Sequence, residues 1–389
     1  MARRASIIVL DGLGIGSAHD TEAYGDGGSD TLGNVLRAAG GLALPNLERL
    51  GLGCCAPLEG VAAVRSPAAS YGTAQPASAG KDSITGHWEL CGVVLERPFP
   101  TYPAGFPPEL IAEFERGTGR GVLANKAASG TAIIEEFGEE HQRTGKWIVY
   151  TSADSVFQVA AHEATVPLHE LYAACAAARQ FLRGEHAISR VIARPFVGPP
   201  GHYRRTPNRK DFSLEPPGST LLDQLAERGI PRVGVGKVDD LFAARGIAST
   251  HTATNAEAYQ LIREALGTMP HGLLFANVIE FDQTWGHRND VPGFLGGLEE
   301  LDRALPGLLG AVQTEDLIIF TADHGNDPTT PSTDHSRERV PLLVYGPRVG
   351  AVALGERQTF ADIGQAVADF LGSAPLAAGT SFLPEVWSG

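Results

Sequence analysis

The sequence predicts an α/β protein in which a mostly parallel sheet is flanked by helices and a second α/β domain is inserted into the first. Apolar runs typical of buried strands alternate with helical segments along most of the chain, and this alternation favours parallel pairing. With 389 residues, the chain also exceeds the roughly 250–300 residues at which a single core stops growing. Two domains are therefore expected.

The expected core begins with a strand at residues 6–10, followed by helices at 31–39 and 45–50. Residues 51–80 are rich in Gly, Ala, Ser and Pro and are expected to form a long loop over the sheet. The later elements are expected as helices at 219–228, 255–266, 293–312 (interrupted or ended near Pro306) and 359–371, and as strands at 231–235, 273–279, 317–320 and 340–344.

A change in sequence composition marks the inserted domain. Prolines are frequent from residue 98 to 108 and return at 216–217, and such clusters are typical of linkers. We therefore expect residues 99–214 to form an inserted α/β cap domain that binds substrate, and residues 1–98 and 215–389 to form the core. Within the cap we expect helices at 109–115 and 168–184 and strands at 147–152 and 190–196. Its basic stretch at 204–210 fits either a solvated face or a clamp for a substrate phosphate.

Composition and charge narrow the function. The chain is 43% hydrophobic and 20% charged, as in ordinary folded proteins. Its net charge of −14 excludes a general nucleic-acid binder, which needs a basic face, but allows a phosphorylated small substrate beside bound cations. We find no signal peptide, no apolar run of about 18 residues and too few cysteines for a disulfide framework. These features predict a cytoplasmic protein without membrane partners.

Three apolar strands are each followed by an aspartate: Asp11, Asp282 and Asp323. Parallel strands end at one shared edge of a sheet, so these carboxylates are expected to converge although they lie far apart in the sequence. Three histidines occupy the same loops: His287, His324 and His335. Three carboxylates and three imidazoles suffice for two metal ions about 4 Å apart, and ligands without thiolate favour Mn²⁺, Zn²⁺ or Fe²⁺.

The stretch Gly80-Lys-Asp-Ser-Ile-Thr-Gly-His-Trp-Glu offers two interpretations. In the first, Ser83 or Thr85 simply caps a helix, although a capping box from Thr85 would require Glu or Gln where Trp88 stands. In the second, Thr85 is a nucleophile at a helix N-terminus, where backbone N–H groups can hold a phosphate. The spacing alone does not separate them.

Five stretches resemble bacterial phosphopentomutases of the alkaline phosphatase superfamily. They are the stretch from Gly80, Tyr150-Thr-Ser-Ala-Asp-Ser-Val-Phe-Gln, Arg204-Arg-Thr-Pro-Asn-Arg-Lys-Asp-Phe-Ser-Leu-Glu-Pro-Pro, Phe281-Asp-Gln-Thr-Trp-Gly-His-Arg-Asn-Asp and Ala322-Asp-His-Gly-Asn-Asp-Pro-Thr. The resemblance extends over nearly the whole chain. It implies an alkaline-phosphatase-like core and an isomerase that works in pentose phosphate metabolism.

The resemblance also implies roles for individual residues. Asp11, Asp323 and His324 would hold one Mn²⁺, and Asp282, His287 and His335 the other. Thr85 would be the phosphorylated residue. Sugar phosphate contacts would come from Ser152, Asp154, Val156, Arg194 and Lys210 of the cap, with Arg209 as a neighbour and Lys237 as a further candidate from the core.

Members of the family interconvert ribose 1-phosphate and ribose 5-phosphate, or the 2-deoxyribose pair, and are primed by a sugar bisphosphate. We expect the same activity here, with two Mn²⁺ per chain and a monomeric protein. Ala132 stands where the family usually has glutamate, which leaves a mutase for a modified pentose open. Two further functions compatible with these residues are a metal-dependent phosphatase or phosphodiesterase, and a non-catalytic protein that binds sugar phosphates.

Overall fold

A computed structural model of the chain describes residues 3–152 and 154–388. The chain packs into two compact units, one formed by Met1–Pro98 with Pro216–Gly389 and the other by Phe99–Glu215. The boundary expected from the sequence ends the insertion one residue earlier, at residue 214. Among the described residues, no helix is both long and apolar enough to cross a membrane.

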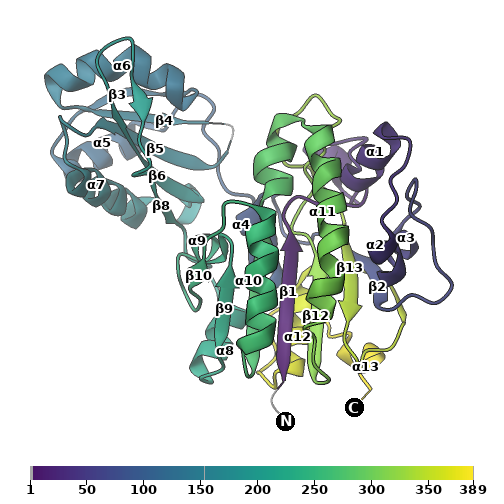
Figure 1. Cartoon of the computed structure of the whole chain (residues 1–389). Helices are drawn as coiled ribbons and strands as arrows, with labels where there is room; N and C mark the ends of the chain where they lie inside the picture. Colours follow the sequence, from purple (N-terminus) through teal and green to yellow (C-terminus); the bar gives the residue numbers. More distant parts are fainter. Residues whose placement is uncertain (1–2, 153, 389) are drawn as a thin grey trace. The chain divides into compact units, whose positions relative to one another are not determined.

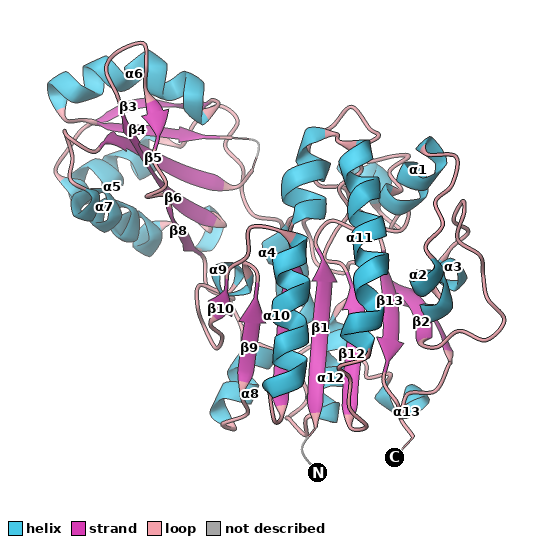
Figure 2. Ribbon diagram, viewed as in Figure 1, coloured by secondary structure: helices cyan, strands magenta, loops and turns pink. Residues whose placement is uncertain are grey.

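The first unit contains an eight-stranded sheet in the order β10-β9-β11-β1-β12-β13-β2-β14. Figure 2 draws its strands in magenta between helices. Their bounds are β1 Arg4–Leu10, β2 Ser70–Ala74, β9 Arg232–Val235, β10 Ser249–Thr250, β11 Gly272–Val278, β12 Asp316–Thr321, β13 Val340–Tyr345 and β14 Ala353–Arg357. All neighbouring strands pair in parallel except β13, which runs antiparallel to both β12 and β2. The predicted mostly parallel α/β core is thereby confirmed.

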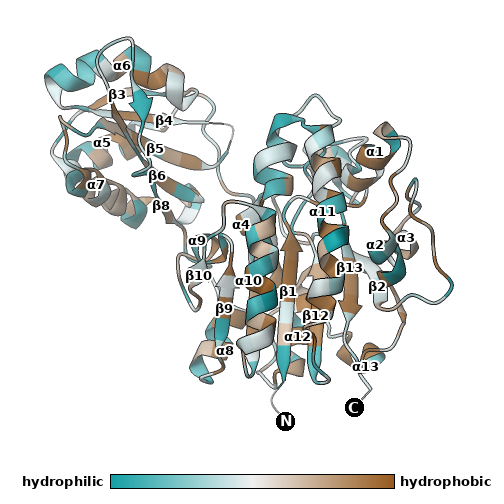
Figure 3. Ribbon diagram, in the orientation of Figure 1, coloured by the Kyte–Doolittle hydropathy of each residue, from teal (hydrophilic) through white to brown (hydrophobic). Residues whose placement is uncertain are grey.

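The three central strands are buried along their whole length, and Figure 3 shows them largely in the colour of apolar residues. The register pairs Leu10 of β1 with Val278 of β11, and Val9 with Thr321 of β12. The carboxyl ends of β1, β11 and β12 therefore lie side by side. Loops that leave these ends meet at one edge of the sheet, as expected for parallel strands.

Helices cover both faces of this sheet. Figure 1 shows α10 (Asn255–Thr268) and α11 (Val291–Leu309) across one face, while α12 (Ala361–Phe370) passes behind the strands. α12 packs against α4 (Ser83–Leu90) and α8 (Leu221–Glu227). The remaining helices of this unit include α1 Thr31–Ala38, α2 Pro45–Leu50, α3 Leu52–Cys55, α9 Val238–Leu241 and α13 Leu383–Val386.

Two expectations about this unit were wrong. The segment expected as a long loop contains α3 and the strand β2. The sequence of β2, Ser-Tyr-Gly-Thr-Ala, lacks the apolar run that would predict a buried strand. β2 forms because β13 and β14 pair with it on its two sides. In addition, Pro306 lies inside α11 and does not end it.

The second unit contains its own mixed sheet, β3-β4-β5-β6-β7, with β8 paired to β6. Its strands are β3 Val122–Ala127, β4 Trp147–Thr151, β5 Val156–His162, β6 Arg190–Val197, β7 Arg204–Arg205 and β8 Lys210–Ser213, and its helices include α5 Pro108–Thr118, α6 Gly130–Thr144 and α7 Leu168–Phe181. One face packs against α5 and α7 through a core that includes Trp147 and Phe157. The other packs against α6 around Tyr150 and Phe196. The sequence prediction missed β3, β5 and α6.

Candidate active site

Three buried aspartates follow the central strands of the core sheet. Asp11 comes directly after β1, Asp323 two residues after β12, and Asp282 lies in the π-helical turn Phe281–Trp285 that follows β11. Parallel pairing brings their loops to one edge, as the sequence predicts. A glycine at position 12 is required there, because its φ is +78° and a Cβ would lie 3.2 Å from the Cβ atoms of both Asn326 and Asp282.

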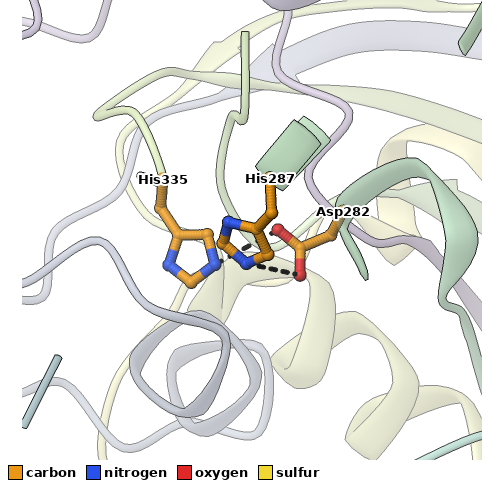
Figure 4. A group of neighbouring side chains, drawn as sticks. All are labelled: Asp282, His287 and His335. Carbon is orange, nitrogen blue, oxygen red and sulfur yellow. Dashed lines mark ion pairs between the residues drawn. The ribbon is translucent and has the colours of Figure 1, made fainter. Parts of the chain in front are cut away.

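Asp282, His287 and His335 form one group whose ligand atoms all lie within 4.8 Å of one another. Figure 4 shows the two imidazoles turned toward the carboxylate. Nε2 of His287 lies 3.4 Å from one carboxylate oxygen of Asp282, and Nε2 of His335 lies 3.1 Å from the other. Their arrangement matches the ligand set that the resemblance implies for one of the two metals.

A second group consists of Asp11, Asp282 and His324, again with ligand atoms within 4.8 Å. Nε2 of His324 lies 3.4 Å from Oδ1 of Asp11 and also 3.4 Å from Oδ2 of Asp323. Asp323 therefore adjoins the group, and its other oxygen accepts a hydrogen bond from the backbone N–H of Gly12. Asp282 belongs to both groups, so its carboxylate links them, whereas the resemblance assigns Asp282 to one metal alone.

Backbone carbonyls orient two of the histidines. Nδ1 of His287 donates to the carbonyl of Thr333 at 2.7 Å, and Nδ1 of His324 donates to the carbonyl of Gly325 at 3.0 Å. In these tautomers the lone pair of each Nε2 faces the carboxylates. Protein ligands of metals are commonly fixed in this way by a hydrogen bond at the second ring nitrogen.

The donor atoms fit divalent cations. Oδ2 of Asp323 and Nε2 of His335 are buried but make no hydrogen bond. The former lies 3.0 Å from Nδ1 of His87, but that nitrogen donates its proton to the carbonyl of Ser83. Buried polar atoms without partners are costly, and a metal ion would satisfy them. Oxygen and imidazole donors without thiolate suit Mn²⁺, Zn²⁺ or Fe²⁺.

Lys237 also belongs to this cluster. It caps α9, and its Nζ lies 2.7 Å from Oδ2 of Asp11 and 3.9 Å from Oδ2 of Asp282. Burial opposes the charge on Lys237, but the attraction of Asp11 and Asp282 raises its pKa overall. Burial likewise opposes ionisation of Asp11, yet Lys237 and His324 together outweigh it, and the pKa of Asp11 falls below its usual range.

Two of the predicted ligand histidines bind protons strongly. Burial disfavours the imidazolium of His324, but Asp323 and Asp11 together with Asp282 raise its pKa to about 10. Burial also disfavours the imidazolium of His287, but its hydrogen bond to Asp282, the charge of Asp282 and the hydrogen bond to Thr333 together raise its pKa to about 9. Both imidazoles therefore carry protons at neutral pH where no metal competes for Nε2.

Helix α4 begins at Ser83, at the edge of this cluster. Asp82 is its N-cap, and Oδ1 of Asp82 accepts hydrogen bonds from the backbone N–H groups of Ile84 and Thr85 at 3.0 and 3.1 Å. The cap therefore lies at Asp82 and not at Ser83 or Thr85, the positions considered from the sequence. Because Asp82 occupies these two N–H groups, they do not hold a phosphate in this conformation.

The two hydroxyl side chains of α4 point to different surroundings. Oγ of Ser83 lies 3.0 Å from Nε2 of His324 and 3.5 Å from Oδ1 of Asp11. The hydroxyl of Thr85 instead donates to Oδ2 of Asp82 at 2.6 Å. Residues two apart on a helix do not share a face, which explains the divergence.

Thr85, the predicted nucleophile, lines a small cavity together with Asp323 and His324. In the described part of the chain, its hydroxyl makes no hydrogen bond to any of the six predicted ligands. Ser83, by contrast, contacts a member of the ligand cluster directly, a role that its sequence position as a helix start does not reveal.

In the second unit, the structure brings only some of the predicted substrate residues together. Arg194 is half-buried and donates from Nε to Gln158 at 3.0 Å. Burial lowers its pKa, and so do the neighbouring charges of Arg209 and Arg205. Three guanidinium groups thus share one face of this sheet with Tyr150. Arg205 belongs to the basic stretch at 204–210 that was expected to form either a solvated face or a phosphate clamp.

The other predicted residues of this unit lie elsewhere. Lys210 packs over the rings of Tyr172 and Phe212, which belong to the core on the α7 face, opposite Arg194. Ser152 and Asp154 flank position 153, which falls outside the described residues. The side chain of Val156 is only 3% exposed, so this residue can offer a substrate its backbone but not its side chain.

The sequence is similar to those of known enzymes. The chain matches the Metalloenzyme superfamily over residues 3–375. It is 56% identical over 388 residues to the phosphopentomutase of Anaeromyxobacter sp. strain K, covering 99% of this chain and 100% of that protein. It is 52% identical over 389 residues to the phosphopentomutase of Dictyoglomus thermophilum, covering 100% of this chain and 99% of that protein.

Solved structures with similar folds include the PH0037 protein from Pyrococcus horikoshii, with a TM-score of 0.49, 16% identity and coverage of 96% of this chain and 98% of that chain. Phosphoglycerate mutase of Leishmania mexicana has a TM-score of 0.44 and 15% identity, covering 100% of this chain and 98% of that chain. The curated relatives are far closer in sequence and match from end to end. Because its identity to them exceeds one half along the whole of both chains, this chain belongs to the phosphopentomutase family of enzymes within the Metalloenzyme superfamily.

Proposed function

We propose that this enzyme interconverts ribose 1-phosphate and ribose 5-phosphate, or the 2-deoxyribose pair, and that Thr85 carries the phosphoryl group between them. One observation supports the role of Thr85, because this residue lines a small cavity together with Asp323 and His324. Ser83 is the competing residue, since its hydroxyl lies 3.0 Å from Nε2 of His324. The names of the relatives support a mutase, and the proposal adds the substrate pair and the residue.

We further propose that Asp11, Asp323 and His324 hold one divalent cation and that His287 and His335 hold another, with Asp282 shared between the two. Mn²⁺ is the cation implied by the resemblance. Two bound cations would neutralise the charge of the transferring phosphoryl group and so stabilise the transition state. Lys237, which contacts Asp11, would supply a further positive charge at the same place.

Two transfers give the net reaction. In the first, the free hydroxyl of the sugar phosphate attacks phosphothreonine 85, the new O–P bond forms, and the bond between phosphorus and Oγ1 breaks. The hydroxyl proton of the sugar passes to Thr85, and the sugar becomes a bisphosphate. In the second, Oγ1 of Thr85 attacks the other phosphate of this bisphosphate, and the proton returns to the released sugar oxygen. A sugar bisphosphate therefore primes unphosphorylated enzyme.

The second unit would bind the sugar phosphate. Its face with Arg194, Arg205 and Arg209 concentrates guanidinium groups, which pair well with phosphate oxygens. Ser152 and Asp154, next to this sheet, would contact the sugar. Exclusion of water is essential to the proposal, because water that reached phosphothreonine 85 would hydrolyse it. The expected monomeric state and cytoplasmic location are part of the same proposal.

The test is to incubate the protein with Mn²⁺, a trace of pentose bisphosphate and ribose 1-phosphate, and to follow the products by ³¹P NMR. We expect ribose 5-phosphate without free phosphate. Release of free phosphate would identify a phosphatase instead, and turnover of another pentose phosphate but not of ribose would identify a mutase for a modified sugar. Mass spectrometry of the quenched protein would locate the phosphate on Ser83 or on Thr85.

A further inference from the structure

Glu338 is a buried carboxylate that receives four hydrogen bonds. It is 1% exposed and accepts from Oγ1 of Thr31 at 2.6 Å, from Oγ of Ser336 at 2.7 Å, and from the backbone N–H groups of Thr31 at 2.9 Å and Gly16 at 3.2 Å. Burying an acidic side chain is costly unless its oxygens are satisfied in this way. These four hydrogen bonds therefore hold the Glu338 side chain in one defined position.

Two glycines make room for this carboxylate. A Cβ at Gly14 or at Gly325 would overlap the carboxyl group of Glu338. Neither glycine has a positive φ, so backbone conformation does not explain why these positions lack a side chain. Their contribution is space, and they hold the loops after β1 and β12 close around Glu338.

A chain of hydrogen bonds runs from Glu338 to the shared ligand. Oγ1 of Thr31, which donates to Glu338, accepts from the backbone N–H of Asn326 at 3.0 Å. Nδ2 of Asn326 then donates to Oδ1 of Asp282 at 2.7 Å. The hydroxyl group of Thr31 has a single hydrogen, and it donates this hydrogen to Glu338. A lone pair of the hydroxyl oxygen therefore faces the backbone N–H of Asn326.

We propose that Glu338 is a positioning residue for the metal centre, and that it acts through Thr31 and Asn326 to orient the carboxylate of Asp282. The inference rests on the proposed function, because it takes Asp282 to be a metal ligand. Loss of groups that orient metal ligands typically costs about 10–100-fold in metal affinity. The effect should be large at Asp282, because this residue belongs to both ligand groups.

A purely structural role for Glu338 is the competing explanation, and the chain offers a matched control. Glu89 is also fully buried in the first unit, and its carboxylate also accepts four hydrogen bonds, from the backbone N–H groups of Ala77, Ser78 and Phe360 and the hydroxyl of Thr359. None of these four donors hydrogen-bonds to Asp282 in the described part of the chain. Glu89 lines the same cavity as Asp323 and His324, so it is also close to the proposed metal centre. Loss of Glu89 therefore tests burial and hydrogen bonding without the hydrogen-bond chain to Asp282.

The experiment measures Mn²⁺ binding by isothermal titration calorimetry and thermal unfolding of the metal-free protein for wild type, Glu338→Gln, Thr31→Val and Glu89→Gln. The Gln amide at position 338 would face groups that are themselves donors, and Val at position 31 removes the relaying hydroxyl. We expect both changes to raise the Mn²⁺ dissociation constant about tenfold or more. Glu89→Gln should lower the unfolding temperature but leave Mn²⁺ affinity within about twofold of wild type.

The inference is overturned if Glu338→Gln or Thr31→Val binds Mn²⁺ like wild type, or if Glu89→Gln weakens binding equally. If Glu338→Gln does not fold, the affinity of Thr31→Val decides the question. Asp282→Asn separates this result from the proposed function. If Asp282→Asn binds Mn²⁺ normally, the proposed metal centre itself is wrong. If it loses Mn²⁺ while both other variants retain it, only the role of Glu338 fails.

Discussion

Oγ of Ser83 lies 3.0 Å from Nε2 of His324, at the carboxyl edge of the core sheet. His324 also faces Asp11 and Asp323, so this single contact joins a hydroxyl group to the buried ligand cluster. The hydroxyl of Thr85 is held by Asp82. Two side chains two positions apart on one helix thus have different chemical surroundings, and this difference can be measured.

Replacing Thr85 should abolish phosphoryl transfer. We expect Thr85→Ala to lose activity by at least about 10³-fold while Mn²⁺ binding survives, because no hydroxyl would remain to carry the phosphate. Thr85→Ser should retain measurable activity, since it keeps the hydroxyl. The measurement is the rate of ribose 5-phosphate formation, together with the phosphate content of protein quenched after incubation with bisphosphate.

Ser83→Ala is the matched control for Thr85→Ala. It removes the other hydroxyl group of the same helix turn and leaves Thr85 in place. We expect it to remain phosphorylated by bisphosphate, although loss of the hydrogen bond between Ser83 and His324 should destabilise the protein by about 1 kcal/mol. If Ser83→Ala lost its phosphate and Thr85→Ala kept it, Ser83 would be the nucleophile.

The contrast between Asp282 and Ser83 shows what could be read from the sequence. The convergence of Asp11, Asp282 and Asp323 was predictable, because parallel strands share a carboxyl edge whatever their separation in sequence. The contact of Ser83 with His324 depends on where α4 begins, and Asp82 sets that start by accepting from two backbone N–H groups. Competing caps within three residues cannot be ranked from sequence alone.

Other features had no local signal at all. β2 carries no apolar run and exists because strands from distant segments pair with both of its edges. The shared position of Asp282 depends on distances between loops after two strands, and spacing in the sequence does not encode them. The hydrogen-bond chain from Glu338 joins residues hundreds of positions apart, so it too becomes visible only in the folded structure.

Metal content should respond differently to two ligand substitutions. Asp282 belongs to both groups of ligand atoms, whereas His287 belongs to one. We therefore expect Asp282→Asn to lose tight binding of both Mn²⁺ ions. His287→Ala should retain one tightly bound Mn²⁺ per chain. The measurement is elemental analysis after dialysis against limiting Mn²⁺. Equal loss in both variants would mean that the two metals bind only together.

The metal-free protein should become less stable as pH rises above neutrality. The pKa of His324 is raised to about 10 and that of His287 to about 9, both above the ordinary value of 6.5. A raised folded-state pKa contributes stability that is fully present below pH 6.5 and is lost as pH rises through 9 and 10. Urea unfolding of chelator-treated protein between pH 6 and pH 10.5 measures this loss.

His324→Gln provides the control for the pH experiment. It removes the group with the higher pKa, so the decline of unfolding free energy with pH should become shallower. The same raised pKa values predict that Mn²⁺ binding at pH 7 releases protons, because an imidazole must be neutral to bind metal. Calorimetric titrations in buffers of different ionisation enthalpy measure the number of protons released per Mn²⁺ bound. Stability that rose with pH in the metal-free protein would contradict the prediction.

Arg194 and Lys210 should differ in their effect on substrate binding, although the resemblance assigns both to it. Arg194 shares a face with Arg205 and Arg209, whereas Lys210 lies over Tyr172 and Phe212 on the opposite face of that sheet. A hydrogen bond to a charged group contributes about 1.5–3 kcal/mol, so Arg194→Met should lower kcat/KM roughly 10–150-fold, mainly through KM. Lys210→Met should cost less than about fivefold, as for an exposed charge. Initial rates over a range of ribose 1-phosphate concentrations distinguish the two, and a larger effect at Lys210 would place the phosphate on the α7 face.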